Sequence, residues 1–433
     1  MSNFDYNQAW KYMCDLQKLG IKLGLEQTRE LFKLAGNPEK KLKFIHLAGS
    51  NGKGSSGAML NAALRRAGFK TGFYASPHMV SPRERFRING EAISHEEFAS
   101  LVTDLSVCTE KMSAEGHSPT FFEFTTAMAA LCFARNNVDF VIWETGMGGR
   151  FDSTNVVTPV CSLITGIALD HHQFLGDTIE KIAVEKAGII KPGRPVFTGK
   201  LQPEAMRVMQ EKADAEASLL VELPKMTTSS LRYVQAESAL MQVFEYDGHE
   251  IELSLSGSMQ RDNFKLVYNV LKFLAEEFEF ELTEALAGLS ETVWPGRCQL
   301  IAGRILIDGA HNPNGINALL EALSELPIPN KIPVVFGSFK DKDTTECLKL
   351  LERVASEFVF LPIATDFRES WSGAELCEMS QKALPQIKAE DAANPAKALS
   401  LVEEYKHVLV CGSLYLAGEF LKELLPEHEI LDI

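Results

Sequence analysis

Short apolar runs alternate with helical segments along the first half of the chain. Apolar runs begin at Phe44, Val138 and Val160, and each leads into a glycine-rich or charged cluster. Residues 56–67 follow the first run with a helical pattern that stops at Gly68. Strands covered on both faces by helices read as nearly continuous apolar runs. The pattern therefore predicts an α/β fold with a mostly parallel sheet.

The pattern changes after about residue 200. The stretch "LRYVQAESALMQVFEYDGHEIELSLSG" is typical of short antiparallel strands, with a turn at Asp247–Gly248. A helix is expected from Asn263, and "WPGR" then interrupts the chain at residues 294–297. Beyond it, runs such as "RILIDGAHNP" and "KIPVVFGSFKDKD" restart an α/β rhythm. We therefore predict two domains, 1–296 and 297–433.

Length and composition narrow the class of protein. A chain of 433 residues is too long for one ordinary core, which supports two domains. The net charge of −15 argues against a general nucleic-acid binder. The eight cysteines are scattered without metal-ligand spacing, and neither a signal-peptide pattern nor an uncharged run of membrane-spanning length is present. We expect a cytoplasmic protein with no membrane and no nucleic-acid partner.

The glycine-rich stretch "GSNGKGS" at residues 49–55 is the first candidate site. It lies between a predicted strand and a predicted helix, where backbone N–H groups can bind a phosphate. Its spacing is shorter than that of the common phosphate loop, and Gly54 separates Lys53 from Ser55. Lys53 could reach phosphate oxygens, and the Ser55 hydroxyl could bind Mg²⁺. The alternative is a simple strand-to-helix turn with a solvated lysine.

Two further strand ends carry groups that could bind a metal ion. Glu144 ends an apolar run and precedes three glycines, and its carboxylate suits Mg²⁺, which prefers oxygen ligands. His171 follows the next run. The alternatives are a carboxylate that caps the following turn and a hydrogen-bonded structural histidine. Because parallel strands end at one edge of the sheet, these groups and the glycine loop are expected there together.

Lys186 is unusual because it falls on an apolar helical stripe. Ile179, Ile182, Ala183 and Ala187 define that stripe, and Lys186 lies on the same face. From the pattern alone, we favour an ammonium that snorkels to water. The alternative is a desolvated amine, which can add CO₂ and become a carbamate that binds a metal ion.

The second half offers a smaller cluster of candidates. "LIDGAHNPNG" places Asp308 and His311 directly after a predicted strand, and "WPGR" supplies Arg297. Arginine can bind phosphate through two parallel hydrogen bonds. The alternatives are a side-chain turn at Asp308 and a surface ion pair at Arg297.

Nine motifs in order carry a resemblance to a known family. "GSNGKGSS", "YASPHM…RERFRING", "FFEFTTAMA", "WETGMGGRFDSTN" and "LDHHQFLGDTIEKIAVEKAGIIKPG" are followed by "WPGR", "DGAHNP", "DKD" and "GSLYLAGE". The sequence resembles folylpolyglutamate synthases and dihydrofolate synthases of the Mur ligase superfamily, from about Gly24 to Glu419. This resemblance implies a P-loop-type ATPase domain, with a mostly parallel sheet plus a small antiparallel sheet, and a C-terminal Rossmann-like α/β domain.

The resemblance also implies a reaction. ATP would phosphorylate a carboxylate of dihydropteroate or of a tetrahydrofolate glutamate tail, and the amine of L-glutamate would displace the phosphate. ATP, two Mg²⁺ ions and a carbamate on Lys186 are the implied cofactors, and a monomer is the usual state in the family.

The resemblance assigns roles to individual residues. It implies catalytic roles for Lys53, Lys186 and His311; ATP contacts for Asn51, Gly52, Lys53, Gly54, Ser55, Asn263, Arg297 and Asp308; metal binding by Ser55, Glu144, His171 and Lys186; and substrate contacts for Gly24, Ser76, His78, Phe122 and Asp152. The family's usual histidine before Gln260 is Met259 in this chain.

Two other functions fit parts of the pattern. A cell-wall Mur ligase would join an amino acid to another carboxylate, but such chains usually carry a separate UDP-sugar domain, and only 48 residues precede Gly49. A nucleotide-binding module without catalysis is the second alternative. Five candidate residues present together argue against it: Lys53, Glu144, His171, Lys186 and Asp308.

Overall fold

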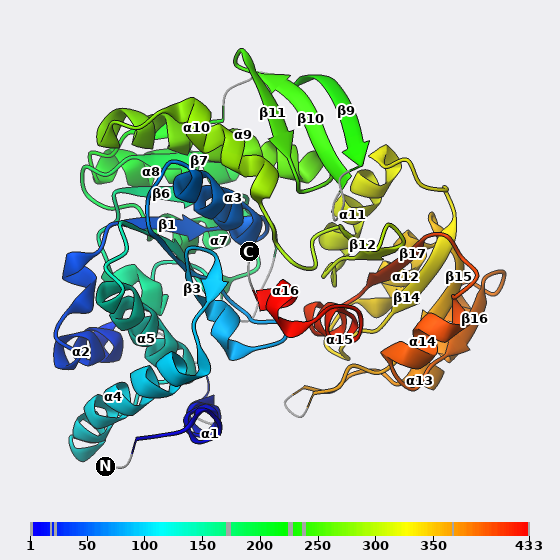
Figure 1. The fold of residues 1–433 in the computed structure, drawn as a ribbon, viewed down its shortest axis with the longest axis horizontal. Helices are drawn as coiled ribbons and strands as arrows, with labels where there is room; N and C mark the ends of the chain where they lie inside the picture. The colour runs from blue at the N-terminus through cyan, green and yellow to red at the C-terminus, as the bar shows by residue number, and fades with distance from the viewer. Residues whose placement is uncertain are drawn as a thin grey trace. The chain divides into compact units, whose positions relative to one another are not determined.

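The computed structural model describes residues 3–17, 20, 24–169, 175–223, 228–235, 240–365 and 368–431. These residues form two compact units. Unit 1 comprises the described residues through 223 together with Asp262–Gly288, and unit 2 comprises residues 228–261 together with Leu289–Leu431. Each unit is built around its own sheet of mostly parallel strands (Figure 1).

Unit 1 contains an eight-stranded sheet in the order β4-β3-β2-β5-β1-β6-β7-β8. Pairing is parallel from β2 across to β8, and the β2–β3 and β3–β4 pairs at one edge are antiparallel. The predicted mostly parallel sheet is therefore confirmed. The strands are β1 (Phe44–Ala48), β2 (Thr71–Tyr74), β3 (Phe86–Ile88), β4 (Glu91–Ala92), β5 (Phe140–Glu144), β6 (Cys161–Ile164), β7 (Val196–Thr198) and β8 (Leu220–Glu222).

Helices cover both faces of this sheet because successive strand residues point to opposite sides. Tyr74 and Trp143 join the core with residues of α1, α4 and α5. Their neighbours Phe73 and Ile142 face the other way, against Gly57 of α3. The described helices of unit 1 are α1 (Tyr6–Gln17), α2 (Glu26–Leu34), α3 (Lys53–Arg66), α4 (His95–Ala114), α5 (Phe121–Arg135), α7 (Ile179–Ala187), α8 (Pro203–Ala215), the part of α9 (Ser258–Phe278) from Asp262, and α10 (Leu282–Ala287).

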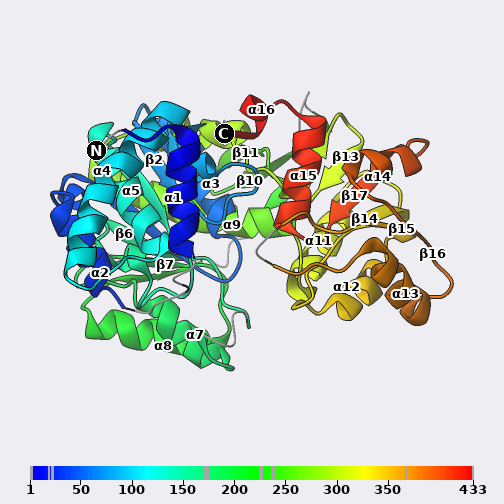
Figure 2. The ribbon, with the colours of Figure 1, turned by 90° about the horizontal axis from the view of Figure 1, so that it is seen from below.

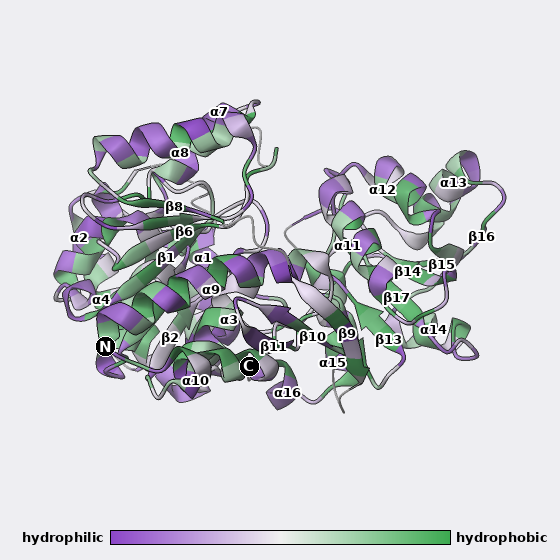
Figure 3. Cartoon of the chain, turned by 90° about the horizontal axis from the view of Figure 1, so that it is seen from above, coloured by the Kyte–Doolittle hydropathy of each residue, from purple (hydrophilic) through white to green (hydrophobic). Residues whose placement is uncertain are grey.

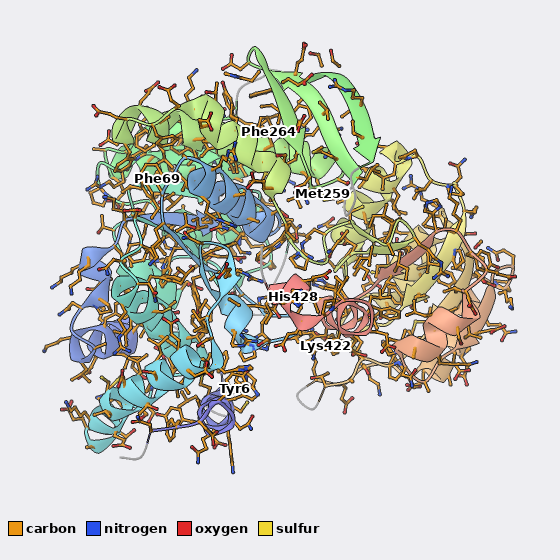
Figure 4. All side chains as sticks on the ribbon, viewed as in Figure 1. Tyr6, Phe69, Met259, Phe264, Lys422 and His428 are labelled. Atoms are coloured by element: carbon orange, nitrogen blue, oxygen red, sulfur yellow. The ribbon has the colours of Figure 1, made fainter. Side chains whose placement is uncertain are left out.

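Aromatic contacts fix several of these helices. Tyr6 of α1, labelled in Figure 4, packs on α4 with ring centroids 4.1 Å from His95 and 5.3 Å from Phe98. Phe69, which follows α3, lies 5.0 Å from the Phe140 ring and 5.4 Å from the Phe280 ring. The first contacts join α1 to α4, and the Phe69–Phe140 contact holds the segment after α3 against β5.

The described residues of unit 1 also include three short 3₁₀ helices. Helices α7 and α8 lie side by side (Figure 2). The fully buried strands β1 and β6 are mostly coloured hydrophobic in Figure 3, whereas α8 carries both hydrophilic and hydrophobic residues. The 3₁₀ helices are η1 (Pro38–Lys41), η2 (Pro82–Arg85) and η3 (Ser153–Val156).

Unit 2 contains a three-stranded antiparallel sheet and a six-stranded sheet. The antiparallel sheet comprises β9 (Ser229–Gln235), β10 (Leu240–Tyr246) and β11 (His249–Leu253). The predicted turn at Asp247–Gly248 is confirmed, and both residues have positive φ, 50° and 79°. Such angles match the twist of a tight hairpin.

The six-stranded sheet has the order β12-β13-β17-β14-β15-β16 and is parallel except for the β12–β13 pair. It has the α/β character predicted for the C-terminal half. The strands are β12 (Gln299–Ile301), β13 (Ile305–Ile307), β14 (Ile332–Phe336), β15 (Ala355–Phe360), β16 (Lys388–Asp391) and β17 (Val408–Cys411). The helices are η4 (Gly288–Glu291), α11 (Pro313–Glu325), α12 (Thr344–Leu351), α13 (Gly373–Ala383), α14 (Pro395–Leu401), α15 (Leu414–Leu424) and α16 (Glu427–Leu431).

The two units do not divide the chain as the predicted domains do. The antiparallel sheet clusters with the C-terminal half, because Leu240, Tyr233 and Met259 belong to the apolar core that contains α11. The domain boundary at 296/297 stays a prediction. Among the described residues, no helix is both long and apolar enough to cross a membrane.

Candidate functional site

The glycine-rich loop of residues 49–52 joins β1 to α3, as the sequence predicts. Gly52 has φ 88° and precedes Lys53, the first residue of the helix. The Lys53 ammonium donates a hydrogen bond to the carbonyl oxygen of Gly49, at 2.9 Å. The first N–H groups of a helix have no partner within the helix and can bind an anion. The loop thus has the backbone geometry and the cation that a phosphate site needs.

Glu144 lies beside this loop. It ends β5, which pairs in parallel with β1 so that Leu47 faces Glu144 in the register. Its carboxylate is buried, and the Oε1 atom lies 3.8 Å from the Lys53 Nζ atom. The structure therefore brings together two residues that the sequence singled out separately.

A hydroxyl that sequence reasoning missed fixes the loop. Thr165, directly after β6, donates from Oγ1 to the carbonyl oxygen of Asn51 at 2.6 Å. A Cβ atom at position 49 would lie 1.9 Å from the same Oγ1 atom, so only glycine fits there. The Ser50 N–H also donates to the carbonyl oxygen of Gly166, at 2.8 Å. The sequence feature that could have indicated Thr165 is a hydroxyl residue directly after a predicted buried strand.

Asn263 approaches the other end of the loop. Its place on α9 brings the side chain against Gly52, where a Cβ atom would lie 2.5 Å from Asn263 Oδ1. The predicted ATP residue and the glycine-rich loop are therefore in contact. Ser55, in the first turn of α3, is buried at the same end of the helix.

Lys186 does not snorkel, so the interpretation favoured from the pattern is wrong. Only 3% of the residue is exposed, and its neighbours on the helical stripe are buried with it. Lysine is almost never buried to this degree without a partner. The glycine turn after β5 packs against the same end of α7, since a Cβ atom at Gly149 would lie 3.1 Å from the Lys186 carbonyl oxygen. His171 lies outside the described residues.

The donor set near the loop suits a hard cation. Ser55 offers a hydroxyl and Glu144 a carboxylate, and both are oxygen ligands of the kind that Mg²⁺ binds. In the described part of the chain, no group of three or more His, Cys, Asp or Glu side chains could by itself hold a metal ion. The residues present fit a site completed by phosphate oxygens and water, because Mg²⁺ in proteins usually keeps such ligands.

Two predicted substrate residues meet at the turn after β5. The Phe122 ring covers Gly146, where a Cβ atom would lie 2.4 Å from the ring. Asp152 accepts a hydrogen bond from the N–H of Met147 at 2.8 Å through Oδ2. Burial raises the pKa of Asp152, although hydrogen bonds from Met147, Thr154 and Gly146 oppose the shift. The turn therefore joins an aromatic surface to a buried carboxyl group.

The remaining predicted substrate residues lie in loops of the same unit. Gly24, with φ 142°, precedes α2, and α2 contacts both α5 and η3. Ser76 precedes a cis proline. The His78 ring accepts at Nδ1 from Arg85 Nε at 2.9 Å and lies 5.8 Å from the Trp10 ring.

Asp308, Arg297 and His311 form a second cluster, in unit 2. The Asp308 carboxyl group accepts from the N–H groups of Cys298 at 2.8 Å and Ala310 at 2.7 Å. Burial raises the pKa of Asp308, and the Arg297 charge opposes this shift. His311 Nδ1 lies 3.0 Å from the Gly309 carbonyl oxygen, and therefore carries the proton. The hydrogen bond from the Ala310 N–H to Asp308 Oδ1 is the side-chain turn considered as the alternative for Asp308. The ATP contacts of Arg297 and Asp308 stay predictions.

Comparisons with known proteins agree on one family. Residues 296–414 match the family model described as Mur ligase, glutamate ligase domain. The chain is 37% identical to a dihydrofolate synthase/folylpolyglutamate synthase of Bacillus subtilis, over 97% of this chain and 99% of that protein. It is 32% identical to a folylpolyglutamate synthase of Lacticaseibacillus casei, over 97% of this chain and 99% of the relative.

Solved structures give the same picture. A Mycobacterium tuberculosis folylpolyglutamate synthase complexed with ADP and AMPPCP has a TM-score of 0.85 at 26% identity, covering 98% of this chain and 100% of its own. The E. coli FolC protein in complex with DHPP and ADP has a TM-score of 0.80 at 27% identity, covering 96% of this chain and 97% of its own. The predicted fold class is confirmed by these likenesses.

Proposed function

Because this chain belongs to the dihydrofolate synthase/folylpolyglutamate synthase family of ATP-dependent ligases, we propose that it adds L-glutamate to a pterin-containing carboxylic acid. The acceptor is dihydropteroate, the glutamate tail of tetrahydrofolate, or both. The observation that carries this proposal is the placement of Lys53 and Glu144 at the glycine loop, with Lys53 Nζ 3.8 Å from Glu144 Oε1. That arrangement is what phosphoryl transfer needs, since its catalysis is mostly positioning and charge stabilisation.

The proposed reaction has two steps. A carboxylate oxygen of the acceptor attacks the γ-phosphorus of ATP, the bond to the β-phosphate oxygen breaks, and an acyl phosphate and ADP form. The glutamate amine then attacks the acyl carbon and loses a proton, and the tetrahedral intermediate collapses with release of inorganic phosphate. An amide bond is made and one ATP becomes ADP and phosphate.

The residues of the loop would hold the nucleotide. Backbone N–H groups of Asn51 to Ser55 would bind phosphate oxygens, and the Lys53 ammonium would neutralise charge as the phosphoryl group moves. We assign Asn263 to the adenine side, as the family resemblance implies, and its contact with Gly52 supports a place near ATP. Arg297 and Asp308 would also contact ATP, and His311 would lie near the phosphate or the incoming glutamate.

Ser55, Glu144, His171 and Lys186 are the proposed holders of Mg²⁺. When bound, Mg²⁺ supplies positive charge that offsets the charge of the phosphate groups. Ser55 and Glu144 contribute a hydroxyl and a carboxylate, which are the ligand types that this ion prefers.

We propose that Lys186 is carbamylated. Its burial supports this, because a buried lysine favours the neutral amine that adds CO₂. Exchanging Lys186 for alanine should abolish most ligase activity, and added short carboxylates such as acetate or formate should restore part of it. Full activity of Lys186→Ala without any addition would contradict a metal role.

The acceptor would bind at the turn after β5. Phe122 offers a ring for stacking on a flat heterocycle, and Asp152 offers a carboxyl group for its N–H donors. Gly24, Ser76 and His78 would line the approach. Cytoplasmic location and a monomeric state stay predictions from the sequence.

Mass spectrometry of the products tests the function. The protein is incubated with ATP, L-glutamate and either dihydropteroate or tetrahydrofolate, and we expect at least one acceptor to gain the mass of a glutamate residue. Continuous ADP production should require both acceptor and glutamate, because the acceptor alone permits only the first step, and little ADP should form without the acceptor. A gain on another carboxylic acid alone would favour the other Mur-type amino-acid ligase, and ATP binding without any product would favour a non-catalytic module.

A further inference from the structure

Three buried side chains form a hydrogen-bonded chain that leads to Asp152. His46 lies in β1, Thr154 in η3, and Asp152 directly before η3. His46 Nε2 is 3.0 Å from Thr154 Oγ1, and that Oγ1 is 2.5 Å from Asp152 Oδ1. The exposed fraction is 0% for His46 and Thr154 and 6% for Asp152, so water does not compete for these bonds.

The chemistry of the groups sets the direction of both hydrogen bonds. Asp152 accepts from the N–H groups of Met147 and Thr154, which favours an ionised carboxylate despite burial. The single O–H of Thr154 therefore donates to Asp152, and its oxygen accepts from His46 Nε2–H. His46 Nδ1 has no hydrogen-bond partner among the described residues. An unpaired buried acceptor is more readily tolerated than an unpaired N–H, so the proton belongs on Nε2.

The backbone of Thr154 is held by hydrogen bonds that do not involve its hydroxyl. Trp143 Nε1 donates to the carbonyl oxygen of Thr154 at 3.0 Å, and the Thr154 N–H donates to Asp152 Oδ1 at 3.0 Å. The backbone of Thr154 would therefore stay in place without its hydroxyl. Only the link between His46 and the carboxylate depends on that one atom.

We propose that His46 is a positioning residue for the acceptor, acting through Thr154 on the Asp152 carboxylate. Its N–H holds the Thr154 hydroxyl in the rotamer that donates to Oδ1. The carboxylate is thereby kept ionised and oriented toward the N–H donors of the acceptor's pyrimidine ring. This inference rests on the proposed function, in which Asp152 contacts the pterin.

If the hydrogen bonds of His46, Thr154 and Asp152 serve stability alone, a different result is expected. Asp152 also caps η3 and binds the turn after β5, so the three residues could serve stability alone. Loss of the His46 donor would then lower the melting temperature and affect ATP and acceptor alike. A positioning role affects the Michaelis constant of the acceptor and leaves that of ATP unchanged.

Two matched pairs of variants in the full-length chain separate these outcomes. His46→Leu removes the donor at similar volume, whereas His46→Gln can place an amide N–H near the position of Nε2. Thr154→Val removes the hydroxyl, whereas Thr154→Ser keeps it. His117→Leu, an exposed position after α4, is the control for the loss of a histidine. Steady-state KM for acceptor and for ATP, kcat and melting temperature are measured for each.

We expect His46→Leu and Thr154→Val each to raise the KM for acceptor about three- to tenfold, the net contribution of one ordinary hydrogen bond. The ATP KM should change less than about twofold, and His46→Gln and Thr154→Ser should restore most of the acceptor affinity. Equal effects on both substrates, or no recovery in either conservative variant, would overturn the inference. If His46→Leu does not fold, the Thr154 pair decides the question.

Asp152→Asn separates this inference from the proposed function. A raised acceptor KM in Asp152→Asn with unchanged values in His46→Leu and Thr154→Val would refute only the role of His46. Unchanged acceptor affinity in Asp152→Asn would refute the contact between Asp152 and the acceptor, and with it the basis of this inference.

Discussion

Burial lowers the tendency of the His46 imidazole to take up a proton, and its position in the sequence does not indicate this. The imidazole lies in the middle of β1 and is fully buried. Burial lowers the pKa of His46 to about 3, and the nearby Lys191 charge adds to the shift. The ring is therefore neutral in the folded protein at every pH at which the protein would work. A histidine in an apolar strand gave no such indication when the sequence was considered alone.

The first prediction concerns acid stability. In the unfolded chain His46 has an ordinary pKa near 6.5 and takes up a proton below that pH, whereas the folded ring does not. A lowered folded pKa contributes stability above about pH 6.5 that is lost as the pH falls toward about 3. The loss approaches roughly 1.4 kcal/mol per pH unit for one group.

Urea unfolding near pH 7 and near pH 5 measures this effect. Between pH 7 and pH 5, the free energy of unfolding of the wild type should fall by on the order of 1–2 kcal/mol more than that of His46→Gln, because glutamine does not titrate. The other acidic groups titrate equally in both proteins and cancel in the comparison. Parallel losses in the two proteins would show that His46 is not the group responsible.

The loop between β1 and α3 depends on the elements that surround it. β5 supplies Glu144, the residues after β6 supply the Thr165 hydroxyl, and α9 supplies Asn263. None of these is close to the loop in sequence. The parallel sheet brings them together because β1 lies between β5 and β6. The loop is thus a property of neighbouring strands as much as of its own glycines.

The second prediction uses two glycines of similar backbone conformation at the two ends of α3. Gly52 has φ 88° and Gly68 has φ 91°. A Cβ atom at position 52 would lie 2.5 Å from Asn263 Oδ1, whereas position 68 has nothing within 4 Å. Exchange for alanine at position 68 should therefore cost only backbone strain, about 1–2 kcal/mol. Exchange at position 52 should cost that strain and also displace Asn263.

Nucleotide titration calorimetry distinguishes the two variants. Gly52→Ala should weaken ATP binding at least about tenfold, which is the effect of losing one or two hydrogen bonds to charged phosphate. Gly68→Ala should bind ATP as wild type does, with only a lower melting temperature. Similar ATP affinities in both variants would mean that the loop conformation does not govern binding.

Each of the two units is built from stretches that are not consecutive in the sequence. Residues 228–261 leave unit 1 and cluster with unit 2, and the chain then returns for Asp262–Gly288. Within unit 2, Glu325 of α11 pairs with Arg261 in the first turn of α9 and also binds Tyr233 of the antiparallel sheet. Arg261 donates to both Glu325 carboxylate oxygens, at 2.8 and 2.7 Å, and Tyr233 donates to the same carboxylate at 2.9 Å. The Arg261 hydrogen bonds lower the pKa of Glu325.

The third prediction is that the coupling energy of Arg261–Glu325, which joins α9 to α11, exceeds that of Arg232–Glu250, an exposed pair within the antiparallel sheet. The Arg261 and Glu325 side chains are 11% and 27% exposed, whereas those of Arg232 and Glu250 are 53% and 57% exposed. A double-mutant cycle on urea unfolding should give a coupling energy of about 2 kcal/mol for Arg261–Glu325. The Arg232–Glu250 pair should give less than about 0.5 kcal/mol. Equal coupling energies would show that the buried pair does not hold α9 to α11.

Local signals in the sequence were sufficient for several features. The apolar runs predicted strands, Gly68 predicted the end of α3, and Asp247–Gly248 predicted the hairpin turn. The loop with Lys53 was found for the same reason, because its chemistry and its flanking elements lie within a few consecutive residues. The order of nine motifs then identified the family.

Features that depend on contacts between distant residues required the tertiary structure. The pattern placed Lys186 on an apolar stripe but predicted the wrong environment for it, since periodicity does not show what covers a helix. It also gave no reason to link His46 with Asp152, or the antiparallel sheet with α11. The sequence by itself determined the elements, the glycine-rich loop between β1 and α3, and the family, because these depend on neighbouring residues. Burial, proton position and the partners of each site residue were decided by packing, because distant segments meet only in the folded chain.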